Sequence, residues 1–79
     1  MNVNDIIVLE NNKNYLLLLD TVIKADKYYL AVELDNNENP TNNYVVVREE
    51  KEGNDIYMEI TEDPYIYSEL IKMHSEQSK

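Results

Sequence analysis

Apolar residues along this chain fall in short runs that are separated by clusters of Asn, Asp, Glu and Lys. The runs are rich in Val, Ile, Leu and Tyr, which fit the half-buried surface of a sheet, and most of them are too short for helices. The connections between runs are also short, so consecutive strands should pair antiparallel. We therefore predict five strands, at residues 6–9, 15–23, 28–34, 44–48 and 56–60.

The pattern changes after the fifth run. Asp63 is expected to cap a helix whose first position is Pro64, where the missing N–H costs no hydrogen bond. A helix of about eleven residues is marginal alone in water, so it should pack on one face of the sheet. Its apolar stripe comprises Ile66, Tyr67, Leu70, Ile71 and Met73.

These elements predict an α+β fold, in which a mainly antiparallel five-stranded meander carries one C-terminal helix on one face. The 79 residues allow a single domain over residues 1–79, with an ordered part at about 4–74 and a frayed tail from Ser75. Four consecutive leucines at 16–19 cannot alternate between two faces. They indicate either a central strand that is covered on both faces or a bulge.

A helix on one face leaves the other face of the sheet for solvent. Alternation along the third strand points Tyr28, Leu30 and Val32 to the core, and along the fifth strand it points Ile56, Met58 and Ile60 inward. The outward positions then mix tyrosines with carboxylates. The expected partner-binding residues are Tyr29, Glu33, Asp35, Glu49, Tyr57 and Glu59. Tyrosine is enriched at interface centres and carboxylates select basic partners, whereas outward tyrosine pairs also stabilise sheets that bind nothing.

The charge balance restricts the class of partner. Sixteen acidic residues face seven basic ones, which gives a formal net charge of −9. Direct binding to nucleic acid or to an anionic membrane is therefore unfavourable, and a basic protein surface is the expected partner. The alternative is that the acidity only keeps the protein in solution. Because the chain has no Cys, no membrane-spanning apolar run and no basic secretion signal, we expect a cytoplasmic location.

The Asn-rich segment 33–43 is the strongest candidate for a metal site. Asp35, Asn37 and Asn39 match the first three ligand positions of a calcium-binding loop. The sixth position, which requires Gly, holds Pro40, and the twelfth, which requires Glu, holds Val46. We therefore expect this segment to turn the chain as a solvated hairpin loop.

Catalytic chemistry has little support in the residues. His74 is the only histidine and Gly53 the only glycine, which excludes paired-histidine metal sites and glycine-rich phosphate loops. Carboxylates such as Glu50 and Glu52 are expected in a turn, where solvent screens them, whereas acid-base catalysis by two carboxyl groups requires a pocket. The expectation is a protein that is not an enzyme and that takes no cofactor or metal.

Two segments carry a resemblance to a known family. The stretch LLLLDTVIKADKYYLAVEL has a Leu-Asp-Thr strand end, a short turn and a Tyr-rich strand, and YVVVREEKEGNDIYMEITEDPYIYSELIKM is an acidic strand pair with a closing helix. Residues 6–74 thereby resemble the YrzB-like family of short acidic proteins from Gram-positive bacteria, a domain of unknown function. The chain departs from that family in being Asn-rich between Leu34 and Tyr44. The resemblance implies the fold and assigns no activity.

In size, acidity and lack of catalytic groups, the chain is also similar to acidic inhibitors that phages encode, among them anti-CRISPR and anti-restriction proteins. That similarity implies a mimic of nucleic acid that occupies the groove of a nucleic-acid-binding protein. The first hypothesis is thus a binding module that regulates or inhibits a basic protein. The second is a structural or housekeeping accessory protein that self-associates as a homodimer through an edge strand.

Overall fold

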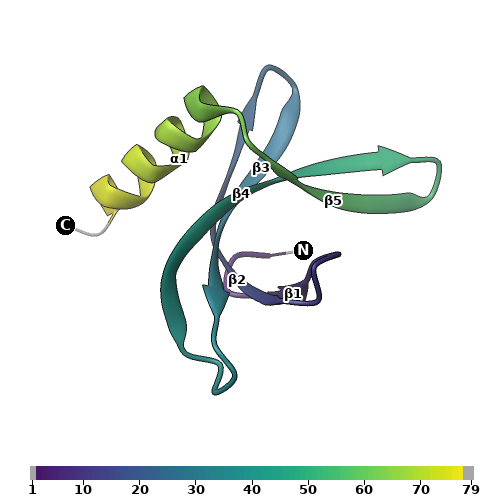
Figure 1. The fold of residues 1–79 in the computed structure, drawn as a ribbon. Coiled ribbons are helices and arrows are strands. Elements are labelled where there is room, and N and C mark those ends of the chain that lie inside the picture. Colours follow the sequence, from purple (N-terminus) through teal and green to yellow (C-terminus); the bar gives the residue numbers. More distant parts are fainter. Residues whose placement is uncertain (1, 78–79) are drawn as a thin grey trace.

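The computed structural model describes residues 2–77, which form five strands and one helix (Figure 1). The elements are β1 (Ile6–Val8), β2 (Asn14–Ile23), β3 (Asp26–Leu34), β4 (Pro40–Glu52), β5 (Asp55–Thr61) and α1 (Pro64–Gln77). The strands lie in the order of the sequence and each pairs antiparallel with the next. The sheet is curled, and the predicted α+β meander with a C-terminal helix is confirmed.

Two tight turns join the long strands. Lys24 and Ala25 connect β2 to β3 with φ of 51° and 72°, the pair of positive values that defines a type I′ hairpin. Gly53 and Asn54 connect β4 to β5, and the φ of 62° at Gly53 fits a type II′ turn, whose first central position is normally glycine. Both turn types match the right-handed twist of the flanking strands.

The Asn-rich segment turns the chain between β3 and β4 as expected, but the loop covers only residues 35–39, because residues 33–34 belong to β3 and residues 40–43 to β4. Asp35 Oδ1 accepts hydrogen bonds from the backbone N–H groups of Asn37 at 2.8 Å and Asn39 at 2.9 Å. The Asp35 N–H in turn donates to the Asn39 carbonyl at 2.9 Å. Asp35 thus holds the turn together by bonding its own following backbone, which is the usual role of Asp in loops.

A bulge in β2 resolves the run of four leucines. Leu17 pairs with Ala31 and Leu19 with Leu30, so Leu18 is an extra residue without a counterpart on β3. The bulge places Leu17 and Leu19 on opposite faces of the sheet, although residues two apart in a regular strand share a face. Both leucines are buried, so the strand is central, covered on both faces and bulged.

The central strands separate two clusters of buried side chains. The cluster under α1 consists of Leu19, Tyr28, Leu30, Val46, Ile66 and Leu70. The cluster on the opposite face consists of Leu9, Tyr15, Leu17, Tyr29, Ala31 and Val47, with Met58 of β5 packed against it. The prediction of one solvent-facing side is therefore wrong at the centre of the sheet. The curl of the sheet encloses the second face with its own outer strands and the β1–β2 loop.

The helix starts as predicted and ends later. Asp63 Oδ1 accepts the Tyr65 N–H at 2.9 Å, which makes Asp63 the N-cap before Pro64. Ile66 and Leu70 are the buried positions of α1, whereas Tyr67 and Met73 are exposed, so its apolar face is narrower than expected. The predicted frayed tail is wrong as far as Gln77, because α1 continues to that residue; positions 78 and 79 lie outside the described residues.

Candidate functional site

The end of the β4–β5 hairpin projects from the body of the sheet. The last recorded β3–β4 pair is Lys27 with Glu49, whereas β4 continues to Glu52 and pairs there with β5 alone. We call residues 48–60 of this hairpin the arm; it extends to the right in Figure 1. The arm exists because β4 has 13 residues and β3 has nine, so the two strands cannot end together.

The two faces of the arm differ in chemistry. Residues that pair directly across an antiparallel ladder share a face, and so do residues two apart in one strand. The pairs Arg48–Glu59, Glu50–Tyr57 and Glu52–Asp55 therefore lie together on one face, which we call the acidic face. The pairs Glu49–Met58 and Lys51–Ile56 lie on the other face.

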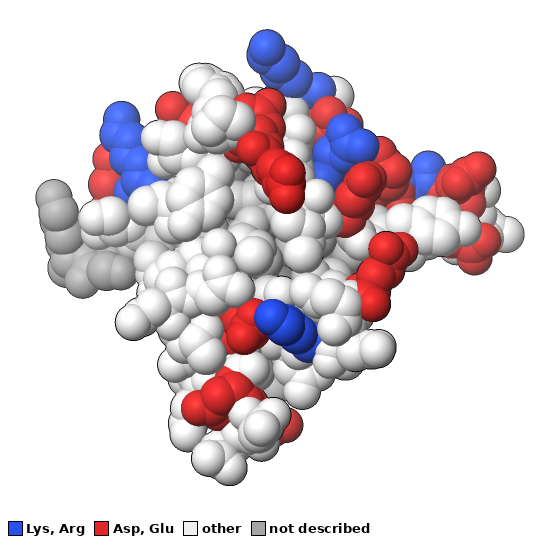
Figure 2. Space-filling model, in the orientation of Figure 1, with Lys and Arg blue, Asp and Glu red and all other residues white. Residues whose placement is uncertain are grey.

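The acidic face holds four carboxylates and one guanidinium. Arg48 Nη2 bonds Glu50 Oε1 and lies 3.7 Å from Glu59 Oε2, so a single cation serves two acids. Within residues 2–77, no ion pair is recorded for Glu52 or Asp55 at the tip. Figure 2 shows carboxylates crowded around the arm, next to uncharged side chains. A surplus of negative charge thus remains on a protruding surface.

Tyr57 lies in the middle of this acidic face. It is 50% exposed and pairs with Glu50 across the ladder. Its neighbour on the other face, Ile56, is 52% exposed. Tyr57 is the most exposed tyrosine of the described strands, since Tyr15, Tyr28 and Tyr29 are buried and Tyr44 is half-buried. Exposed aromatic residues of this kind are enriched at interfaces.

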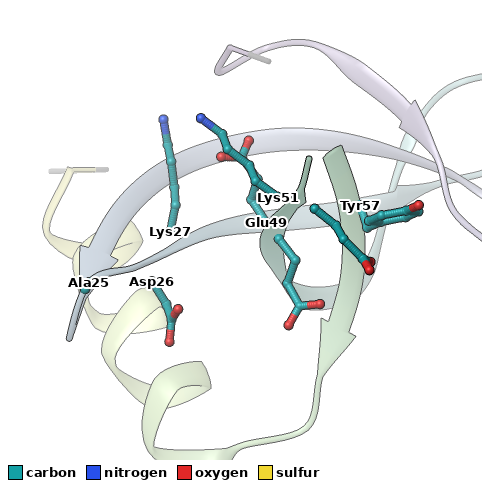
Figure 3. A pocket seen from close by; sticks show the side chains of 8 residues that line it. Ala25, Asp26, Lys27, Glu49, Lys51 and Tyr57 are labelled. Atoms are coloured by element: carbon teal, nitrogen blue, oxygen red, sulfur yellow. The ribbon is translucent and has the colours of Figure 1, made fainter. Parts of the chain in front are cut away.

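Two lysines near the arm, Lys27 and Lys51, lie on the side opposite the acidic face. Lys27 and Lys51 extend in the same direction in Figure 3, whereas Asp26 points the opposite way. The two lysines line a shallow hollow of about 640 Å³ between the β2–β3 turn and the arm, together with Glu49 and with Glu50, Glu52 and Tyr57 of the acidic face. Lys27 Nζ lies 3.7 Å from Asp20 Oδ2, and within residues 2–77 no ion pair is recorded between either lysine and a carboxylate of the acidic face.

Tyr29, a predicted contact residue, is instead a core residue. It is 0% exposed, its O–H donates to Glu49 Oε1 at 3.1 Å, and Lys27 Nζ lies 5.4 Å from the ring centroid. Burial raises the pKa of the Tyr29 phenol, and the hydrogen bond to Glu49 adds to this effect. The pKa of Lys27 is also raised, chiefly by its hydrogen bond with Tyr29. The expectation that Tyr29 faces solvent is wrong.

Glu33 and Asp35 lie at the end of β3 that is remote from the arm. Glu33 Oε1 accepts a hydrogen bond from Asn43 Nδ2 at 3.0 Å and pairs with Lys13 Nζ at 3.2 Å. The Asn43 hydrogen bond and the Lys13 ammonium lower the pKa of the Glu33 carboxyl. Asp35 is committed to the β3–β4 loop. These two acids have local structural partners and do not join the acidic face.

The structure therefore divides the predicted set. Tyr57 and Glu59 lie together on the acidic face, Glu49 lies on the other face of the same arm, and Tyr29 is buried. Sequence reasoning missed Glu50, Glu52 and Asp55 as members of one surface, because it ended the fourth strand at Arg48. The alternation of Arg48, Glu50 and Glu52 was the available signal. The prediction that Ile56 and Ile60 point into the core is also wrong, because both side chains are exposed.

Comparisons of this chain with protein-family models, with curated proteins and with solved structures find no match. The resemblance to the YrzB-like family consequently stays a prediction. Among residues 2–77, no three His, Asp or Glu side chains are grouped so that they could hold a metal ion. In the same part of the chain, α1 lacks the length and the apolar character that crossing a membrane requires.

Proposed function

We propose that this protein is a non-enzymatic binding module that docks the acidic face of its arm onto a basic surface of another protein and thereby regulates or inhibits it. One observation carries the proposal: four carboxylates surround a half-exposed Tyr57 on one face of a hairpin that projects beyond the sheet. The partner class is a nucleic-acid-binding protein, whose groove is basic. The expected site of action is the cytoplasm of a bacterium, or of its host cell if a phage encodes the protein.

The carboxylates, Tyr57 and Arg48 have different roles on the acidic face. The carboxylates attract a basic partner over roughly 8 Å at physiological ionic strength and so speed the encounter. Tyr57 supplies a rigid contact area that loses little conformational entropy on binding. Arg48 lies between Glu50 and Glu59 and holds both acids on the face without neutralising it. In this arrangement the charges select the partner and the ring contributes most of the contact energy.

Capture from a bacterial lysate tests the proposal. The wild-type protein is immobilised beside a variant with Glu50→Gln, Glu52→Gln and Glu59→Gln, and a control with Glu38→Gln, Glu69→Gln and Glu76→Gln. Both variants lose three negative charges, but the control loses them outside the arm. We expect wild type and control to retain the same basic protein, which salt elutes, and the arm variant to lose it. Equal capture by all three would contradict the proposal.

Competition with DNA tests whether the protein mimics nucleic acid. Double-stranded DNA added during capture should displace the retained protein if both occupy one groove. Retention that is indifferent to DNA would place the docking surface of the partner elsewhere and remove the mimic from the proposal.

A second candidate is self-association of a structural or accessory protein. Ile6 and Val8 on the short edge strand β1 are 50% and 65% exposed, and an exposed apolar edge favours strand pairing between copies. Sedimentation of the wild type and of Val8→Lys tests this candidate. A wild-type dimer that the substitution dissociates would support it, and a monomer across the micromolar range would exclude it.

A further inference from the structure

Strand β5 has a second edge that no strand of the described chain covers. Its recorded pairing partners all belong to β4, and within residues 2–77 the first strand of the order, β1, does not pair with it. The curled sheet therefore stays open between β1 and β5 (Figure 1). Natural sheets protect such edges with Pro, Lys or bulges. β5 has the sequence DIYMEIT and an unbroken register, so it lacks Pro, Lys and bulges, and its only charged side chains are those of Asp55 and Glu59.

The turn geometry identifies the backbone groups on this open edge. A two-residue turn makes Glu52 and Asp55 a hydrogen-bonded pair, and such pairs then alternate along the ladder. Tyr57 and Glu59 consequently bond to β4. The N–H and C=O groups of Ile56, Met58 and Ile60 point away from β4, toward the open edge.

The same three residues carry the apolar side chains of β5. Ile56 and Ile60 are 52% and 38% exposed, and Met58 is half-buried against the core. Next to Met58 and Ile60, a groove of about 280 Å³ is lined by Leu9, Glu10, Asn11 and Glu59. The open edge thus offers backbone hydrogen-bonding groups and apolar contacts at the same positions, which is the combination used in strand addition.

Charge selects the occupant of this edge. A second copy of the chain would bring another net charge of −9, and β5 itself carries two acids and no cation. Glu10 and Glu59 flank the groove, and Glu59 is 67% exposed. An added strand with cationic side chains is attracted here, whereas a second acidic copy is repelled.

We propose that the open edge of β5 binds an extended segment of a basic protein as an additional strand, in which Lys or Arg alternates with Val, Ile or Leu. Side chains of an added strand share faces with the residues they oppose. The apolar residues of the segment therefore pack on Ile56, Met58 and Ile60, and its basic residues lie beside Tyr57 and Glu59. A cation over the Tyr57 ring adds to the attraction. This inference rests on the proposed function and specifies how the partner is recognised.

Synthetic peptides test strand addition. The probe is a capped seven-residue peptide that alternates Lys with Val, and its match has the same sequence with N-methyl groups on alternate amides of its bonding edge. N-methylation keeps every side chain and charge but removes the N–H donors of the bonding edge, and the methyl groups block its close approach to β5. We expect the methylated peptide to bind about tenfold or more weakly. On binding of the probe, amide exchange should slow at Ile56, Met58 and Ile60, and change little at Tyr57 and Glu59.

A pair of protein variants gives an independent readout. Ile56→Thr combined with Ile60→Thr keeps β-branched residues in the strand but removes its apolar contacts, whereas Val22→Thr does the same on β2. The double variant should bind the probe several-fold more weakly than the Val22 control. Equal binding by both would overturn the apolar part of the proposal.

The outcomes separate this inference from the proposed function. If both peptides bind equally, with salt-sensitive affinity and unchanged exchange at the three edge amides, strand addition is overturned while docking of the acidic face stands. If neither peptide binds, strand addition is overturned and the lysate capture alone decides the proposed function. If the edge amides are protected without peptide as protein concentration rises, a second copy is the occupant and the basic segment is overturned.

Discussion

Tyr29 and Tyr57 share a residue type and an acidic neighbourhood, yet the fold gives them opposite roles. Tyr29 on β3 is 0% exposed and uses its O–H to bond Glu49, with Lys27 beside its ring. Tyr57 on the arm is 50% exposed and lies among carboxylates that share a single arginine. Strand length produces the difference, because β3 is flanked along its length by two strands and the tip of the arm is not. A tyrosine beside acids is therefore a core residue or a contact residue according to how far its neighbouring strands extend.

Replacing each tyrosine by alanine should give the largest difference in stability between the two sites. Tyr29→Ala should lower the free energy of unfolding by about 3–5 kcal/mol. It leaves a cavity between β2 and β4, and it leaves the partly buried carboxylate of Glu49 without the hydrogen bond from Tyr29. Tyr57→Ala should lower it by less than about 1 kcal/mol, since half of its ring is already in water. Urea unfolding of both variants measures the difference. Similar losses for the two would mean that the arm is part of the core.

A smaller effect sharpens the comparison at the tip of the arm. Gly53 has a φ of 62°, and no atom lies within 4 Å of the position of an added Cβ. Gly53→Ala should therefore cost only the backbone strain of a positive φ, about 1 kcal/mol. Amide exchange should accelerate in the arm and hardly change at Leu30. Uniform acceleration through the sheet would show that the arm and the body unfold together.

The turn of the β2–β3 hairpin should respond in the opposite direction. Ala25 holds a φ of 72° with a Cβ, and Gly adopts this conformation without strain. Ala25→Gly should raise the free energy of unfolding by about 0.5–1 kcal/mol, after the greater freedom of glycine in the unfolded chain is subtracted. Thermal unfolding beside Gly53→Ala provides the matched pair. A loss of stability in both variants would contradict the turn types assigned to the two hairpins.

The smallest effect concerns the end of the body remote from the arm. The folded-state pKa of Glu33 is lowered from its ordinary 4.5, chiefly by the Asn43 hydrogen bond and also by Lys13. The stabilisation by ionised Glu33 is therefore present above the unfolded pKa of 4.5 and is lost as the pH falls through the lower folded pKa. Wild type should be slightly more stable than Glu33→Gln at pH 7, and the gap should close in acid. If the stability difference between wild type and Glu33→Gln grew as the pH fell, the stabilising role of ionised Glu33 would be contradicted.

The elements of the fold could be read from the sequence because their signals are local. Asp63 and Pro64 marked the start of the helix, and the leucine run pointed to a bulged or doubly covered strand, which β2 is. Burial on both faces was missed because alternation was imposed on residues 28–32. That stretch is apolar throughout, a pattern typical of a strand covered on two sides, and all five residues are buried.

The acidic face was harder to predict, because it depends on where β4 ends. Polar residues on both sides of the apolar centre of β4 favour loops by composition, yet the strand extends through them as far as Glu52. Pairing with β5 across a two-residue turn keeps them in the ladder, and this tertiary context overrides their low strand propensity. Tyr57 and Glu59 were found because β5 alternates clearly, whereas Glu50, Glu52 and Asp55 became neighbours only through the observed register.

The most direct test of the central claim is the dissociation constant between the captured basic protein and Tyr57→Ala, with Tyr65→Ala as control. Both substitutions leave the net charge unchanged, and both tyrosines are exposed, but Tyr65 lies on α1. If Tyr57 is the contact centre of the acidic face, Tyr57→Ala should weaken binding by about tenfold or more while its salt dependence stays that of wild type. Tyr65→Ala should bind as wild type does. An unchanged dissociation constant for Tyr57→Ala would contradict the assignment of the arm as the binding surface.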